Sequence, residues 1–317
     1  MGKIFKEYEQ MDIFGNTLEE QVEKSLFDKF IIPPFSIFDT RQGYWQDRKR
    51  VWLSLGIKSE IGRNSKCFHM QEWADKKRES GDLRGNKLPN DISIFDPVVC
   101  EICYKWFNIE RGTILDPFAG GSVRGIVATK LGYDYMGIDL REQQCQANYE
   151  NAAELHCNPK WHCDDAIHLN KYVSRESVDM IFTCPPYFDL EKYSDDPKDL
   201  SNMDYKDFGD AYECIIQNCI WALKPNRFAV FVVGDVRDKN GFMVSLRDLT
   251  IKCFEKNGVK LYNDIVLATS LASASLRAEK PFTVNRKITK VHQYILVFYK
   301  GDSKEIKNNF KDLDLDY

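Results

Sequence analysis

The sequence lacks the features that mark secreted, membrane-spanning and broadly basic proteins. Its start, residues 1–10, is polar and contains no apolar signal core, and no later stretch approaches the roughly 18 apolar residues of a membrane span. A surplus of basic residues is also missing, because the formal net charge is −4. We therefore expect a cytoplasmic protein without membrane contact, whose surface for any anionic partner is a local patch.

Metal-site and disulfide patterns are missing as well. The histidines and cysteines offer no cluster that would hold a metal; His162 and Cys163 are adjacent, but packing explains them. The ten cysteines are irregularly spaced, and the pair Cys100 and Cys103 has no second CxxC with which to complete a zinc site. We expect no metal, and thiols that are reduced and mostly buried.

What is present is the pattern of a doubly wound α/β protein. Residues 1–90 look irregular, whereas from about residue 91 short apolar runs alternate with helical stretches, which is typical of βαβ units and a parallel sheet. The expected division is an N-terminal appendage over 1–90, which is a candidate for nucleic-acid contacts, a catalytic domain over 91–302 and a charged tail over 303–317.

Seven strands are expected, forming a mostly parallel sheet whose last two strands pair antiparallel. They are expected at Thr113–Asp116, Tyr135–Asp139, Lys160–Cys163, Val178–Thr183, Phe228–Val233, Asp264–Thr269 and Gln293–Tyr299. Helices are expected at Val123–Leu131, Arg141–Glu154 and Met243–Asn257.

A glycine turn joins the first expected strand to its helix. In the run Asp116-Pro-Phe-Ala-Gly-Gly-Ser122, Gly120 and Gly121 let the backbone approach a ligand closely. The run is neither a dinucleotide GxGxxG motif nor a phosphate loop, because the Lys-Ser/Thr pair is absent. A carboxylate beside such a turn suits a ligand with an amino-acid head, whose ammonium group needs an anionic partner.

Two further carboxylates follow the next strands. Asp139 ends the second strand, where an acidic residue binds ribose hydroxyls in sheets of this kind, and Asp165 follows the third strand, where it can bind an adenine amino group. The alternative for each aspartate alone is a helix N-cap. Three aspartates at successive strand ends favour a cofactor site.

The fourth strand ends in the run Thr183-Cys-Pro-Pro-Tyr187. Pro185 and Pro186 fix the turn and remove two backbone donors. The carbonyl oxygens of Cys184 and Pro185 can therefore accept hydrogen bonds from the N–H groups of an attacking amino group. Tyr187 offers a flat face on which a flipped base can stack.

The glycine turn and this run together resemble the motifs of the amino-group DNA methyltransferases, and in particular of phage and prophage DNA methylases. The usual motifs of that family are DPFxGxGT and [Asp/Asn/Ser]-Pro-Pro-[Tyr/Phe], and the resemblance extends over about residues 91–300. It implies a Rossmann-like S-adenosylmethionine-dependent methyltransferase fold, S-adenosylmethionine as cofactor and double-stranded DNA rather than RNA as partner. It also implies methyl transfer to adenine N6 or cytosine N4 of a flipped base, in a bacterial host or a phage-infected cell.

The resemblance also implies site residues. The segment at Phe95-Asp96-Pro97 resembles the one that packs over the methionine end of the cofactor, although many members have Lys-Pro there. The implied catalytic residues are Cys184, Pro185, Pro186 and Tyr187. The implied cofactor residues are Phe95, Asp96, Pro97, Asp116, Phe118, Gly120, Gly121, Ser122, Asp139 and Asp165.

Cys184 departs from the family pattern, which has Asp, Asn or Ser at this position. A thiol is a weak acceptor, so the main-chain oxygens would do most of the orienting. Alternatively, Cys184 is a nucleophile, as in cytosine carbon-5 methyltransferases. An RNA amino methyltransferase and a non-catalytic DNA-binding protein are further alternatives, and the target base stays open.

Nucleic-acid contacts are expected in the polar connection between the last two strands. Residues 276–291 carry five basic residues against one acid and are expected to form a loop. Asp235 and Arg237, after the fifth strand, are expected either to line the base pocket or to form a salt bridge. A second basic cluster lies between Trp45 and Trp52. The residues expected to bind nucleic acid are Arg277, Lys280, Arg286, Lys287 and Lys290.

Overall fold

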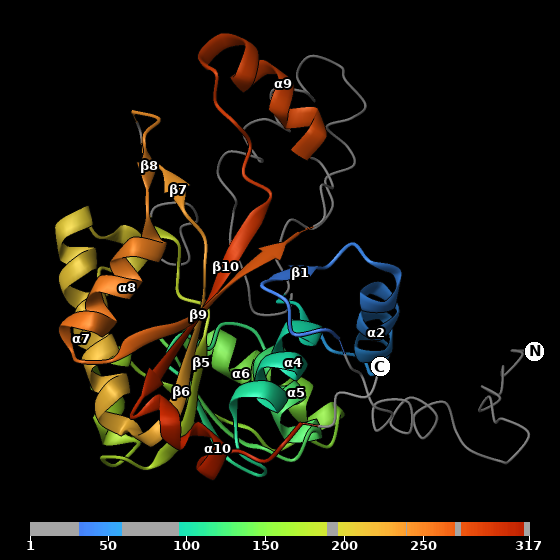
Figure 1. Ribbon diagram of the computed structural model, residues 1–317, viewed down its shortest axis with the longest axis vertical. Coiled ribbons are helices and arrows are strands. Elements are labelled where there is room, and N and C mark those ends of the chain that lie inside the picture. Colours follow the sequence, from blue (N-terminus) through green and yellow to red (C-terminus); the bar gives the residue numbers. More distant parts are fainter. Residues whose placement is uncertain (1–31, 59–94, 189–195, 239, 270–273, 314–317) are drawn as a thin grey trace, which may run out of the picture.

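The computed structural model describes residues 32–58, 95–188, 196–238, 240–269 and 274–313. Its centre is an eight-stranded sheet with strand order β1-β9-β10-β6-β5-β2-β3-β4 (Figure 1). The strands are β1 (Ile37–Asp39), β2 (Thr113–Asp116), β3 (Asp134–Asp139), β4 (Lys160–Cys163), β5 (Val178–Thr183), β6 (Leu223–Val233), β9 (Lys260–Ala268) and β10 (His292–Lys300).

The sheet is parallel apart from β10, which runs antiparallel to both β6 and β9. The expected doubly wound, mostly parallel sheet is therefore confirmed. From β2 the chain proceeds outward to β3 and β4, and then crosses back to β5 on the other side of β2. The strand order thus reverses between β2 and β5, and ligands of open α/β sheets bind at the carboxyl ends of the strands at such a point.

Helices cover both faces of the sheet, because apolar side chains alternate along its central strands. On β5, Met180 and Phe182 face one core and Ile181 faces the other. The first face carries α2 (Gly43–Ser54), α4 (Pro97–Phe107), α5 (Val123–Lys130) and α6 (Glu142–Glu154). The second carries the short helix η2 (Ala166–Lys171), α7 (Tyr205–Ala222) and α8 (Leu246–Lys256) (Figure 1).

The N-terminal region differs from the expected irregular appendage, because its described residues join the core. Strand β1 pairs with β9 and gives the sheet eight strands instead of seven. Trp45 and Trp52, seven positions apart on one face of α2, are fully buried. Between them, Arg48 pairs with buried Glu101, and Lys49 pairs with Asp96. This basic cluster therefore has structural partners. A further basic run, Lys76-Lys77-Arg78, lies outside the described residues.

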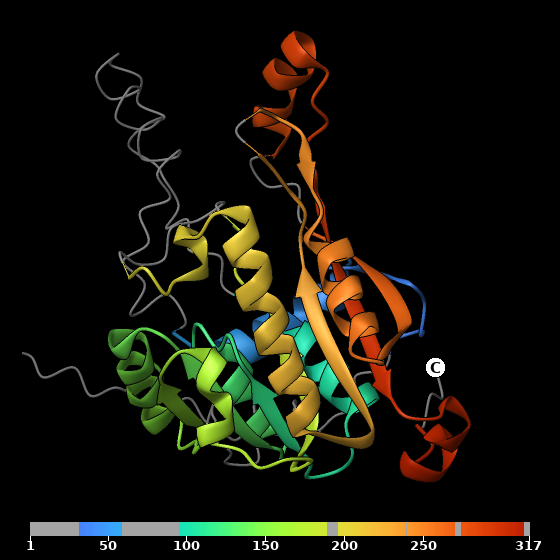
Figure 2. The ribbon, with the colours of Figure 1, turned by 90° about the vertical axis from the view of Figure 1, so that its left-hand side faces the viewer.

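A second difference concerns the segments beyond the carboxyl ends of the strands. The expected loop over 276–291 begins as a helix, α9 (Ala274–Asn285), and the expected start of α8 is instead a strand of a hairpin formed by β7 (Val236–Arg237) and β8 (Met243–Val244). The hairpin and α9 project from the body of the molecule (Figure 2). Three short helices complete the described residues: η4 (Leu200–Asn202), η5 (Ser303–Glu305) and α10 (Ile306–Asn309).

None of the described helices is long and apolar enough to cross a membrane.

Candidate active site

Asp116, the last residue of β2, is fully buried and organises the start of the glycine turn. Its carboxylate accepts four hydrogen bonds, from the main-chain N–H of Phe118 (3.2 Å) and from Arg124 Nε (2.6 Å), the Tyr135 hydroxyl (2.8 Å) and the Thr183 hydroxyl (2.6 Å). Four donors use the roughly four lone-pair positions of a carboxylate. Asp116 thereby connects β2 to α5, β3 and β5.

Arg124, in the first turn of α5, is the buried cation that pairs with Asp116. Its Nη2 donates to the carbonyl oxygens of Phe118 and, at 2.8 Å, Ala119, and its guanidinium lies 4.9 Å from the ring centre of Phe95. Burial alone lowers the pKa of Arg124, but the charges around it, that of Asp116 foremost, together raise the pKa above its ordinary value. The arrangement differs from the expectation that Asp116 pairs with a ligand's ammonium group.

The crown of the turn is formed by Gly120, whose φ of 51° is the left-handed conformation that favours glycine. Its N–H donates to Asp139 Oδ2 at 2.9 Å, and its carbonyl accepts from the Asn148 side chain at 2.7 Å. Gly120 is partly exposed, so its backbone lies at the surface of the turn.

The remaining residues of the turn differ in their accessibility. Gly121 and Ser122 are buried, and the Ser122 hydroxyl donates to Asn151 at 2.8 Å. The Phe118 ring is partly exposed and stacks near Tyr212, with 6.1 Å between ring centres. Of the expected cofactor residues in this turn, Phe118 and Gly120 are accessible to a ligand.

The carboxylates at the ends of β3 and β4 are partly exposed and also hold local backbone. Asp139 Oδ1 accepts from the N–H of Arg141 at 2.9 Å. Asp165 caps η2 by accepting from the N–H of Ile167 at 3.0 Å. The neighbouring Asp164 has a lowered pKa, chiefly because His168 donates a hydrogen bond to it. The aspartates therefore line up at adjacent strand ends. Of the three, Asp165 forms the helix N-cap expected as the alternative, whereas Asp116 and Asp139 hold turn backbone without capping a helix.

The segment at Phe95-Asp96-Pro97 lies beside the turn and opens α4. Asp96 caps the helix by accepting from the N–H of Val98 at 3.0 Å, and Pro97 is the first helical residue. The Phe95 ring meets the Phe182 ring of β5 edge-on at 5.8 Å. This places Phe95 between the glycine turn and the strand that carries the proline motif.

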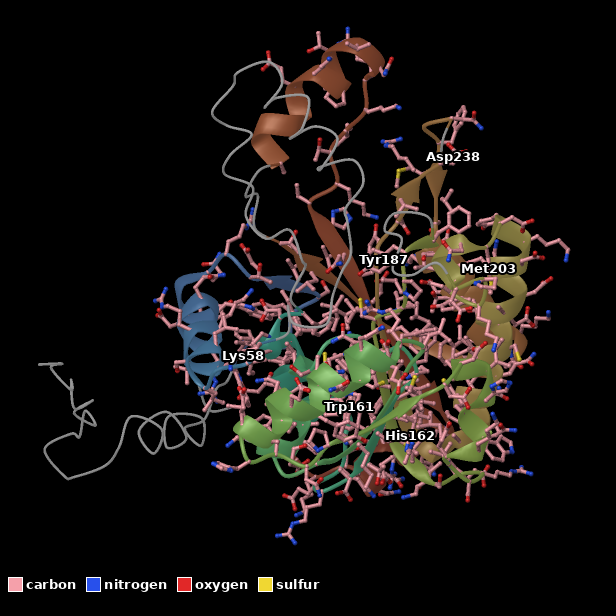
Figure 3. The ribbon with its side chains drawn as sticks, turned by 180° about the vertical axis from the view of Figure 1, so that it is seen from behind. Lys58, Trp161, His162, Tyr187, Met203 and Asp238 are labelled. Atoms are coloured by element: carbon pink, nitrogen blue, oxygen red, sulfur yellow. The ribbon has the colours of Figure 1, made fainter. Side chains whose placement is uncertain are left out.

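Tyr187 lies where the body of the molecule meets its projecting segments (Figure 3). Its hydroxyl accepts a hydrogen bond from Gln293 Nε2 at 2.6 Å and lies 3.3 Å from Cys184 Sγ. Its ring packs so closely on Gly234 that a Cβ there would come within 3.1 Å of it. Pro185 is buried and Pro186 half-buried, so the turn between them is fixed.

A polar cluster around Asp235 adjoins Gly234. Asp235 Oδ2 accepts from Lys290 Nζ at 2.5 Å, and Asp235 Oδ1 accepts from the Ser245 hydroxyl and the N–H of Arg247, both at 3.2 Å. Lys290 Nζ also lies 4.4 Å from the ring centre of Tyr294. Of the two roles expected for Asp235, the structure forms the salt bridge.

The other residues expected to bind nucleic acid lie on the projecting segments. Lys280 on α9 and Arg286 just beyond it are exposed. Lys287 reaches the hairpin, since a Cβ at Gly241 would lie 2.6 Å from its Nζ. The side chain of Arg277 lies outside the described residues.

The sequence matches the model of a DNA methylase family, N6_N4_Mtase, over residues 178–317. The match begins with β5 and includes the proline motif, Gly234 and Gln293. The matched residues, 178–317, are less than half of the chain. The match indicates methyl transfer as the reaction class and S-adenosylmethionine as the cofactor.

The solved structures that we compare with this chain are distantly similar to it. No curated protein matches the sequence. TrmN of Thermus thermophilus is 15% identical, with 65% of this chain and 49% of that chain covered and a TM-score of 0.44. A TehB-like S-adenosylmethionine-dependent methyltransferase of Corynebacterium glutamicum is 16% identical (74% and 100% covered, TM-score 0.39). A second protein of Thermus thermophilus, assigned as a DNA modification methylase, is 23% identical (44% and 53%, 0.34).

The chain spans about half the length of TrmN. All three TM-scores are below 0.5, so the fold is assigned from the strand order described above and not from these structures.

Three residues of the site described above are missing from the sequence-based site. Arg124 could have been found from the sequence, because an arginine eight positions after Asp116 lies in the first turn of the helix that follows the glycine turn. Gly234 and Gln293 had none, because they reach Tyr187 from β6 and β10, and Gln293 lies 106 positions from it.

Proposed function

We propose that this chain transfers a methyl group to an exocyclic amino group, adenine N6 or cytosine N4, of a base flipped out of double-stranded DNA. The observation that carries the proposal is the fixed ring of Tyr187. Gly234 lets the ring lie against β6, and Gln293 and Cys184 contact its hydroxyl. An aromatic face held at a strand end, next to the switch point of the sheet, suits stacking of an extruded base.

The residues around the glycine turn fit S-adenosylmethionine. Gly120 has the left-handed conformation that brings backbone to the surface, and its conformation is fixed by Asp139. Phe118 and Asp165 are partly exposed on either side of Asp139, so the donor set combines an apolar face with carboxylates for hydroxyl and amino groups. When bound, the cofactor supplies an electrophilic methyl group on a sulfonium.

The expected cofactor residues then divide into two groups. Phe95, Phe118, Gly120, Asp139 and Asp165 would touch the cofactor from accessible or half-buried positions. Asp116, Gly121 and Ser122 are buried, so we assign to them the shape of the turn. Asp96 and Pro97 set the start of α4 and thereby the place of Phe95.

Orientation of the substrate amino group falls to the main chain of the proline motif. Carbonyl oxygens of Cys184 and Pro185 would accept hydrogen bonds from the amino N–H groups, so that the nitrogen lone pair is directed at the methyl carbon. The Cys184 thiol contacts the Tyr187 hydroxyl at 3.3 Å, and as a weak acceptor it contributes less than a carboxylate would.

The test is to incubate the purified chain with unmodified DNA, with RNA and with tritiated S-adenosylmethionine, and to identify the labelled nucleoside by mass. Label as N6-methyladenine or N4-methylcytosine in DNA is expected. Label at cytosine C5 would indicate that Cys184 is a nucleophile, and label only in RNA would indicate that RNA and not DNA is the substrate. Both outcomes, and the absence of label despite cofactor binding, contradict the proposal.

Variants connect the label to the site. Replacing a base-stacking aromatic costs about 1–3 kcal/mol, so Tyr187→Ala is expected to lower kcat/KM roughly 5- to 150-fold. Tyr187→Phe, which keeps the ring, is the matched control. Cys184→Ser is expected to keep or improve activity, whereas a nucleophilic cysteine would lose it completely.

A further inference from the structure

The hairpin β7–β8 rises directly from the place where Tyr187 is held. It begins at Val236, two residues after Gly234, which packs against the Tyr187 ring. Figure 3 shows Asp238, near the end of the hairpin, well beyond Tyr187 on the side away from the body. Anything bound at Tyr187 that extends outward from the body therefore passes along the hairpin.

The end of the hairpin is held in one conformation by its own hydrogen bonds. Asp238 and Phe242 exchange two of them: the N–H of Asp238 donates to the Phe242 carbonyl (2.9 Å), and the N–H of Phe242 donates to Asp238 Oδ1 (2.8 Å). Gly241 takes a φ of 89°, and its carbonyl accepts from Arg237 Nη1 at 2.8 Å. A turn fixed in this way presents Phe242 at low entropic cost.

Phe242 is 74% exposed, the largest exposed fraction among the large hydrophobic side chains of the described residues. It is not an isolated case, because Met243 next to it is 47% exposed. Around the end of α9, Phe282 and Ile288 are 49% and 73% exposed and line a second cavity, which shares Lys287 with the cavity lined by Phe242 and Met243. Contiguous exposed apolar side chains mark an interaction surface more often than single ones do.

The charges beside this surface identify the class of partner. A cavity of about 540 Å³ lies between the hairpin and the end of α9, and its lining includes Arg237, Arg286 and Lys287 but no acidic residue. Cations bordering an exposed aromatic suit a nucleic acid, whose phosphates bind the cations and whose bases accept the ring. A two-stranded β-ribbon also fits the major groove of a duplex, about 12 Å wide.

We propose that the end of this hairpin enters the duplex beside the target base, and that the Phe242 ring occupies the space in the base stack that the extruded base leaves. Arg237 and Lys287 then lie at the flanking phosphates. The inference rests on the proposed function, since it requires a duplex substrate whose base is flipped. Apolar side chains are inserted between base steps in other DNA complexes, and an aromatic ring stacks favourably on bases. Stacking on the bases that flank the gap is the contribution assigned to Phe242.

The first experiment compares Phe242→Ala with the wild-type chain on a duplex that carries the site found by labelling. Stacking of an aromatic on a base corresponds to roughly 5- to 150-fold, and kcat/KM for the duplex is expected to fall by a factor in this range. Cofactor binding stays unchanged, and Phe242→Trp restores activity. The control is Phe35→Ala, because Phe35 is 70% exposed but lies beside β1 at the far edge of the sheet.

The second experiment repeats the comparison on the same duplex with the target base mispaired. A mispaired base is extruded at lower cost, so the loss caused by Phe242→Ala is expected to shrink by about tenfold or to vanish. An equal loss on paired and mispaired duplexes would mean a general contact and overturn the inference. If wild type methylates DNA and Phe242→Ala behaves like Phe35→Ala, the inference about Phe242 is refuted while the proposed function stands. Failure of wild type to methylate DNA at all would refute the proposed function instead.

Discussion

The body and the projecting segments differ in how they place charged side chains. In the body, Asp116 and Glu101 are fully buried, and each pairs with an arginine, Arg124 or Arg48, that is less than 10% exposed. On the projecting segments, Lys280 and Arg286 are exposed. Buried pairs fix the glycine turn and the N-terminal helix in one geometry, whereas exposed cations stay available to a polyanion. The difference teaches that this globally acidic chain keeps its basic surface local.

The largest effect that tests this comparison is expected from Arg124→Met. The substitution leaves Asp116 buried without its cation, and breaking a buried pair costs about 3–5 kcal/mol. The free energy of unfolding in urea measures the loss. The control is Lys58→Met, whose partner Glu154 is half-exposed, with an expected cost below about 1 kcal/mol. Equal small losses in both variants would contradict a structural role for the pair.

The pH dependence of stability should depend on Glu101. Burial alone would raise its pKa, but hydrogen bonds and charge from Arg48 and Lys105 outweigh burial and lower the pKa below its ordinary 4.5. A lowered folded-state pKa stabilises the fold fully above pH 4.5 and progressively less as the pH falls below it. Glu101→Gln is therefore expected to lose about 1.5–3 kcal/mol at pH 7 and part of the acid sensitivity.

Urea titrations of wild type and Glu101→Gln at pH 7 and at pH 4 measure this effect. The exposed Glu154→Gln variant serves as control. A wild-type stability that does not change between the two pH values would refute the assignment.

Gln293 provides a smaller effect at the boundary between the two regions. Its amide donates to the Tyr187 hydroxyl, and a net hydrogen bond is worth about 0.5–1.5 kcal/mol, so Gln293→Leu should lower kcat/KM roughly 2- to 10-fold. If Gln293 acts through that hydroxyl, the same substitution in a Tyr187→Phe background has no further effect. Equal losses in both backgrounds would assign Gln293 a role independent of Tyr187.

The smallest effects are expected from single cations of the projecting segments. Lys280→Ala and Arg286→Gln each remove one candidate phosphate contact, which lowers the slope of log K against log salt by about 1 and leaves stability unchanged. DNA titrations at several salt concentrations measure the slope. Lys304→Ala, an exposed cation on the C-terminal tail, is the control. An unchanged slope for both variants would remove α9 and its end from the DNA surface.

Features of the fold and the site that depend on a few consecutive residues could be predicted from the sequence, whereas features that depend on distant segments could not. Strands β2, β4 and β5 have the predicted bounds. For β2 and β5 the reason is that short, mostly apolar runs bounded by turns determine buried parallel strands locally. The glycine turn and the proline motif were also readable, since each lies within a few consecutive residues. By contrast, α9 was predicted as a loop because its polar, proline-containing sequence lacks a clear helical pattern.

The sequence by itself determined the α/β class, the reaction class and the motif residues from Asp116 to Tyr187. Only the tertiary structure decided the partners of those residues. It paired Asp116 with Arg124 and placed Gly234 and Gln293 against Tyr187. It also joined β1 to β9 across more than 200 positions. The physical reason is that strand pairing and side-chain hydrogen bonds between distant segments depend on register and packing of the whole sheet, which no local pattern records.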